Sequence, residues 1–182
     1  MSSHPIHSID NAPAQSVPVL QTLQQAFGFI PNIAGAMAGS PVLIKAFIGV
    51  FQNVHAGSFS EAQIQTLLLT NAVTNRCSWA VAFHSHLALS QGLTQQDVAA
   101  IRAGHAPADA KHAALSLLAK SLIETRGHPA ADAVRRFLDA GFTREHILEV
   151  IAAVAASTIT NYTGSVANPP LEEAFQAHAW NA

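Results

Sequence analysis

Apolar residues recur every three or four positions through most of the chain from Val17 onward, which is the spacing of one face of an α-helix. Glycines and prolines interrupt this pattern at intervals, and no segment shows a convincing strand pattern. The pattern predicts helices over approximately 18–27, a short stretch ending near 39, 41–55, 60–74, 76–91, 94–103, 109–125, 130–140, 143–160 and a short C-terminal segment containing Phe175 and Trp180. The predicted fold class is therefore all-α, a helical bundle.

Capping signals support several of these boundaries. Ser60 and Gln63 have the spacing of a capping box, and Asn75 is expected to cap the next helix. Residues 89–98 align with residues 138–147 at a constant offset, each with a glycine stop followed by a threonine start. This repeat indicates either a duplicated helical hairpin or a chance recurrence of two common caps.

The length of 182 residues fits one compact domain with a substantial apolar core. Residues 1–16 have no helical spacing and are expected to form an extended N-terminal arm. Residues 17–182 are expected to form a single all-α domain.

The composition favours association with other copies of the chain and argues against nucleic acid and lipid as partners. About 49% of the residues are hydrophobic and only 11% are charged, against roughly 25% in a typical globular protein. We therefore expect some helix faces to be covered by other copies, in a dimer, trimer or hexamer. The net charge of −2 without a basic cluster argues against nucleic acid and anionic lipid. No apolar run is long enough for a membrane span or typical of a signal peptide, so a cytoplasmic location is expected.

The most informative segment begins at Cys77 and reads C-S-W-A-V-A-F-H to His84. Within a helix, the spacing of Cys77, Ala80 and His84 places them on one face, as for a thiol pair with a basic partner. The second sulfur is absent because position 80 is alanine. Cys77 is the only cysteine, so neither an intrachain disulfide nor a thiolate metal site is available. No metal or nucleotide motif is present, and we expect no cofactor.

These residues resemble the alkylhydroperoxidase D-like and carboxymuconolactone decarboxylase superfamily. Its pattern has a glutamate about twelve residues before a C-x-x-C and a histidine four residues after the second cysteine. Here Gln65 takes the glutamate position, Ala80 the second cysteine and His84 the histidine. Shorter motifs of the family, found at 27–32, 40–41, 60–61, 92–94 and 141–143, extend the resemblance over roughly 17–175. Gly164 and Ser165 replace an Asn-His pair found in some relatives.

The resemblance implies an all-α fold and thiol peroxidase chemistry. In complete members one thiolate reduces the peroxide, the second cysteine resolves the sulfenic acid, and the glutamate and histidine relay protons. Gln65 cannot relay a proton, and Ala80 abolishes the intrachain dithiol cycle. What remains is one-cysteine antioxidant chemistry, with Cys77 in a first helical turn beside Arg76, His84 as proton donor and an external thiol reductant.

Each candidate residue also has an ordinary structural interpretation. Cys77 is then a small buried apolar residue in a decayed site, and His84 is a core histidine with a satisfied ring. Gln65 then serves only a buried polar contact. Trp79 and Phe83, beside Ala80, form the wall of a pocket or simply fill the core.

Two other functions remain alternatives. The first is a cysteine-independent lyase similar to carboxymuconolactone decarboxylase, in which His84, Arg76 or Arg144 holds a small carboxylated substrate. The second is a non-catalytic binding or assembly protein that kept the helical scaffold after the dithiol was lost.

Overall fold

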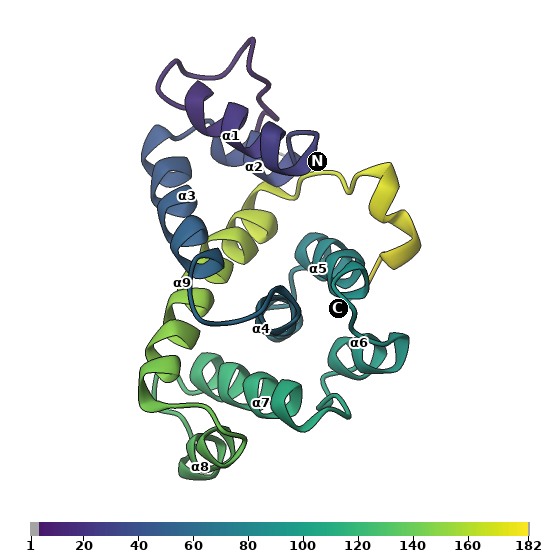
Figure 1. Cartoon of the computed structure of the whole chain (residues 1–182). Coiled ribbons are helices and arrows are strands. Elements are labelled where there is room, and N and C mark those ends of the chain that lie inside the picture. Colours follow the sequence, from purple (N-terminus) through teal and green to yellow (C-terminus); the bar gives the residue numbers. More distant parts are fainter. Residues whose placement is uncertain (1–3, 182) are drawn as a thin grey trace.

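The computed structural model describes residues 4–181, and all regular secondary structure within that range is helical (Figure 1). The prediction of an all-α fold is therefore confirmed. The elements in chain order are α1 (Val17–Phe27), α2 (Asn32–Met37), α3 (Pro41–His55), α4 (Glu61–Thr74), α5 (Ser78–Ser90), α6 (Gln95–Arg102), α7 (Ala110–Glu124), α8 (Ala131–Asp139), α9 (Arg144–Ala167) and the 3₁₀ helix η1 (Glu173–His178).

Helix α4 is the central element of the fold. It is seen nearly end-on in the middle of Figure 1, with α5, α6, α7 and α9 around it. Every residue from Ile64 to Ala72 is buried, so this helix has no solvent-facing side over more than two turns. It begins with the predicted capping box, in which Ser60 and Gln63 bond reciprocally. Because this stretch is buried, its polar residue Gln65 lies inside the protein.

The start of α5 differs from the prediction. Asn75 ends α4 instead of capping α5, and Arg76 adopts a left-handed backbone conformation with φ of 56°. The chain therefore changes direction at Arg76, and Cys77 becomes the N-cap of α5 with extended dihedral angles. Cys77 precedes the first helical turn rather than lying within it, so the predicted common helical face with Ala80 and His84 does not extend to Cys77.

Helix α9 ends seven residues later than predicted, at Ala167. The polar residues after Thr160 resemble a turn in sequence, but their hydroxyl groups bond back to carbonyls four residues earlier. Thr163 donates to the carbonyl of Ile159 and Ser165 to that of Asn161. These bonds satisfy the side chains without interrupting the backbone ladder, and the helix ends only where Asn168 turns left-handed.

Part of α9 is exposed and apolar. The helix is long and apolar enough to span a membrane by length and composition alone, yet it packs against α2, α3, α4, α5 and α7. Leu148, Ile151, Tyr162 and Val166 remain largely exposed, as does Val42 on α3. Such residues are typical of surfaces between subunits, and self-association stays a prediction.

The first and last segments of the described residues 4–181 pack against the bundle. The arm residues 4–16 contain turns and no helix, and the N–H of His7 donates to the carbonyl of Gly35. A Cβ at Gly35 would come within 2.8 Å of the carbonyl oxygen of His7, so this approach requires glycine. The C-terminal segment runs over α5, with η1 beside it (Figure 1).

Candidate functional site

Gln65 and His84 form a hydrogen-bonded pair in the interior. Gln65 projects from the buried stretch of α4 and His84 from α5, with 3.0 Å between the amide oxygen and Nδ1. Their exposed fractions are 3% and 6%. Because the amide oxygen accepts, the hydrogen of the imidazole lies on Nδ1. Nε2 is then left as a hydrogen-bond acceptor.

The imidazole of His84 is uncharged at neutral pH. Burial lowers its pKa to about 3, and the electrostatic interaction with His55 contributes in the same direction. A carboxylate at position 65 would favour the protonated ring, whereas the uncharged amide of Gln65 does not. The replacement of glutamate by glutamine and the low pKa of the histidine are therefore mutually consistent.

His84 borders a small apolar pocket with a cavity volume of about 40 Å³. This volume exceeds that needed by one water molecule. Ser157 and Thr160 of α9 are the only other polar residues that line it. The remaining wall is aromatic and aliphatic, formed by Leu23, Phe27, Pro31, Ile33, Ala34, Phe47, Phe51, Leu68, Trp79, Phe83 and Ala156. The pocket suits an uncharged, mainly apolar molecule.

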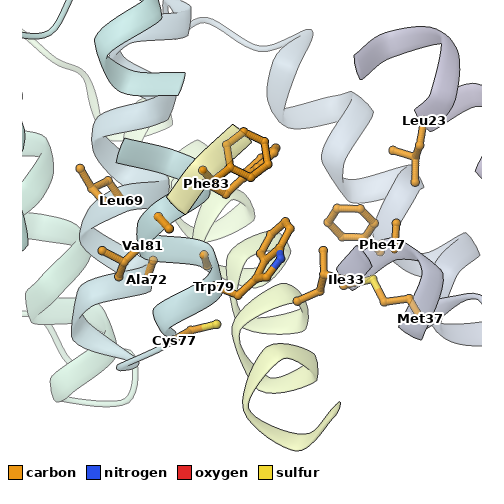
Figure 2. Close-up of a cluster of buried hydrophobic side chains, with 14 of the residues drawn as sticks. Leu23, Ile33, Met37, Phe47, Leu69, Ala72, Cys77, Trp79, Val81 and Phe83 are labelled. Carbon is orange, nitrogen blue, oxygen red and sulfur yellow. The ribbon is translucent and has the colours of Figure 1, made fainter. Parts of the chain in front are cut away.

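Figure 2 shows how the aromatic side chains meet in this region. Trp79 lies between Phe83 on one side and Ile33 and Phe47 on the other, and Cys77 points toward α9. The rings of Trp79 and Phe83 are stacked, with 5.0 Å between their centroids. Trp79 and Phe83 both border the pocket of His84, and their role in binding stays a prediction.

Cys77 borders a different hollow from His84. It lines a depression of about 400 Å³ together with Arg76, Gly164 and Ser165, and Trp79 borders both spaces. The thiol is 3% exposed, and burial raises its pKa, although the N–H groups of Ala80 and Trp79 favour the thiolate. No hydrogen bond joins Cys77 to His84 within residues 4–181.

The position of the second family cysteine is closed to solvent. Ala80 is fully buried in the first turn of α5, within the same apolar cluster as Trp79 and Phe83. The structure thus brings Gln65 and His84 together and leaves Cys77 in separate surroundings.

Glu172 is a structural partner that the sequence analysis did not identify. One carboxylate oxygen accepts from the indole N–H of Trp79 at 2.9 Å, and the other accepts from the backbone N–H of Asn32 at 2.6 Å. Glu172 follows two prolines in a segment without helical periodicity, and no local motif marks it. It fixes the tryptophan that separates the two hollows.

Neither arginine considered for binding a carboxylate reaches the His84 pocket. Arg76 borders the hollow of Cys77, and Arg144 is exposed at the start of α9. With His84 uncharged, the described lining of this pocket provides no cation.

The fold matches solved structures of low sequence identity along nearly its whole length. An uncharacterized peroxidase-related protein with an alkylhydroperoxidase AhpD core, from Ralstonia eutropha JMP134, has a TM-score of 0.83 and 16% identity, with 96% of this chain and 94% of that chain covered. A peroxidase-related protein from Silicibacter sp. TM1040 has a TM-score of 0.78 and 15% identity, over 97% and 93% of the two chains.

A third similar structure is an alanine-for-cysteine variant of the debrominase Bmp8 in complex with 2,3,4-tribromopyrrole, with a TM-score of 0.80 and 19% identity over 98% and 97% of the chains. No curated protein matches the chain. Residues 41–120, which include Gln65, Cys77 and His84, match the model of the carboxymuconolactone decarboxylase family. The chain is therefore similar to the carboxymuconolactone decarboxylase family over residues 41–120, and nearly its whole length has the AhpD-like fold.

Proposed function

We propose that the pocket at His84 binds a small, uncharged, mainly apolar molecule with one hydrogen-bond donor, and that this function does not use Cys77. The observation that carries the proposal is the bond from Gln65 to Nδ1, which fixes an uncharged imidazole at an apolar pocket. Nε2 accepts a hydrogen bond from the donor group of the ligand. Gln65 is the positioning residue.

The lining of the pocket narrows the class of ligand. A carboxylate placed there would lose its hydration without gaining a cation, which is costly in an apolar site. The carboxylated substrate considered from the sequence is therefore the less favourable choice. A ring with an N–H or O–H group suits the apolar walls better, but because the enclosed volume is only about 40 Å³, the side chains around it must move apart for the ring to enter. The tribromopyrrole held by the Bmp8 variant is a ring of this kind.

Phenol and anisole provide a direct test. They are similar in size, but only phenol has a donor, so phenol is expected to bind about tenfold more tightly in a calorimetric titration. In His84→Phe this difference is expected to disappear. Cys77→Ser serves as the control and is expected to bind both molecules as the native chain does. Equal binding of phenol and anisole to the native chain would contradict the proposal.

One-cysteine peroxidase chemistry at Cys77 is the second candidate, and a specific observation favours it. The hollow beside Cys77 includes Arg76 and Ser165, and although burial raises the pKa of the thiol, two backbone N–H groups oppose this effect. The thiolate would attack one peroxide oxygen, breaking the O–O bond to give a sulfenic acid and, after protonation, water or an alcohol. One external thiol would then form a mixed disulfide with loss of water, and a second would release Cys77 and a disulfide.

Mass spectrometry of the intact protein separates the two candidates. Brief exposure to hydrogen peroxide is expected to add one oxygen, about 16 Da, to the native chain and none to Cys77→Ser. Peroxide consumption should require an added thiol. A native chain that gains no oxygen would exclude the peroxidase function and leave the His84 proposal intact. The third alternative is a binding protein without catalytic activity. It predicts that the chain binds phenol but converts neither phenol nor peroxide to a product.

A further inference from the structure

A third hollow lies between α4, α6, α7 and Trp180. Its lining is largely polar and charged, unlike that of the apolar pocket at His84. Its volume is about 350 Å³, within the range of small-molecule sites. Arg76, Arg102 and Lys120 line it, and Glu124 is its one acidic residue. The whole chain has only nine Lys and Arg residues and a net charge of −2. One third of its cations therefore lie around a single depression, where they create a local positive field.

The two arginines have no carboxylate partner within residues 4–181. The half-buried Arg102 donates only to uncharged oxygens, those of the Ser85 hydroxyl and the carbonyls of His178 and Ala179, at 2.8 to 3.0 Å. Burial lowers its pKa. The side chain of Arg76 forms no hydrogen bond or ion pair within the described residues, and its left-handed backbone is unusual for a residue with a long side chain. Neither charge is neutralised by the protein.

Lys120 is only weakly compensated. Its ammonium group donates to the carbonyl of Gly104 at 3.2 Å and lies 4.0 Å from the carboxylate of Glu124, at the limit of an ion pair. This pair is solvent-exposed and so contributes little. The hollow therefore retains a net positive charge.

A hydroxyl group and an apolar wall complete the lining. Thr70 donates to the hydroxyl oxygen of Ser116 at 2.9 Å, and the hydrogen of Ser116 itself has no acceptor within residues 4–181. Ser116 is only 6% exposed. Ile101 and Trp180 form an apolar side, and the indole N–H of Trp180 is held by the carbonyl of Arg102 at 3.3 Å. Charged, hydroxyl and apolar groups thus face one space.

We propose that this hollow binds a small organic anion. Its carboxylate or phosphate group is held by Arg76, Lys120 and the hydroxyl of Ser116, and its apolar part lies against Trp180. Arg76 and Trp180 also border the hollow of Cys77, so the two hollows share these residues. The site is independent of the proposed function, because the His84 pocket disfavours anions.

Titrations with sodium phosphate and sodium benzoate test the proposal, at constant ionic strength maintained with chloride. Saturable binding in the millimolar range is expected by calorimetry for at least one of them, together with a change in Trp180 fluorescence that Trp180→Phe abolishes. The anion that saturates identifies the phosphate or the carboxylate class. Phosphate without benzoate binding, or the reverse, supports the proposal equally.

Charge variants distinguish this site from general attraction of anions. Arg76→Gln and Lys120→Gln are expected to weaken binding at least fivefold, and Glu124→Gln is expected to strengthen it severalfold. Lys45→Gln, at an exposed cation on α3, is the matched control and should change nothing. If neither anion saturates, or if the control weakens binding as much as Lys120→Gln does, the proposal is wrong.

Discussion

Gly164 lies directly against Cys77: a Cβ at position 164 would come within 2.5 Å of the sulfur and 3.2 Å of the Cδ1 atom of Ile33. Helix α9 can therefore approach the start of α5 only because residue 164 has no side chain. The sequence shows this glycine merely as a departure from the family pattern. Its role is to accommodate the thiol.

Gly164→Ala is expected to lower the free energy of unfolding by about 1 to 3 kcal/mol, because the added methyl group overpacks a buried contact. Urea unfolding measures the change. In a Cys77→Ala background the sulfur is absent, and the same substitution should be nearly neutral or stabilising, since alanine favours helices over glycine by about 1 kcal/mol. An equal loss in both backgrounds would show that the contact with Cys77 is not the cause.

Gln65→Glu is expected to raise the pKa of His84, because a carboxylate at Nδ1 favours the protonated ring that the amide does not. Titration of the imidazole by NMR measures the shift upward from about 3. Gln91→Glu, at an exposed position after α5, is the control and should leave the pKa of His84 unchanged. An unaltered pKa in Gln65→Glu would mean that the pair does not persist in solution.

Acid should destabilise the protein through His84. The pKa of this histidine is about 3 when folded and near 6.5 when unfolded, so below pH 6.5 the unfolded chain binds a proton that the folded chain does not. Stability from this group is complete above pH 6.5 and falls by about 1.4 kcal/mol per pH unit between roughly pH 6 and 4. Unfolding at several pH values should show a shallower slope in His84→Gln.

The comparison with His84→Gln isolates this contribution. Asp109 and Glu149 also have lowered pKa values, because they accept backbone N–H bonds from His112 and Ser58, and they too lose stabilisation as the pH falls. Their effects are the same in both proteins and cancel in the difference. If the two slopes were equal, His84 would not be uncharged in the folded state at these pH values.

Glu172→Gln is expected to lower the free energy of unfolding by about 1 to 3 kcal/mol, because two hydrogen bonds lose their charged acceptor. It should also change the fluorescence of Trp79. Glu173→Gln is the matched control, since its neighbouring carboxylate is exposed. Equal stability of the two variants would show that Glu172 contributes nothing to holding Trp79.

The helices could be predicted because their signals are local. The spacing in the sequence alone is enough to recognise the capping box of Ser60 and Gln63 and the N-cap Thr94. In the structure the first caps α4 and the second caps α6. The beginning of α5 could not be predicted in this way. It depends on the left-handed turn at Arg76, a conformation that only glycine and asparagine commonly signal.

Part of the candidate site, the pair of Gln65 and His84, could also be predicted from local spacing in the sequence. Gln65 and His84 have the family spacing, and the structure joins them by a hydrogen bond. The separation of Cys77 from His84 depends on Trp79, whose position is set by Glu172 from far along the chain. Contacts between residues so distant in sequence leave no periodic pattern, and the sequence contains no signal for them.

Glu172 comes long after both of its partners in the chain, and this order has a consequence during synthesis. Asn32 and Trp79 emerge from the ribosome well before the carboxylate that joins them. A nascent polypeptide stalled before residue 172 would carry its tryptophan untethered, and the partition between the two hollows would be incomplete.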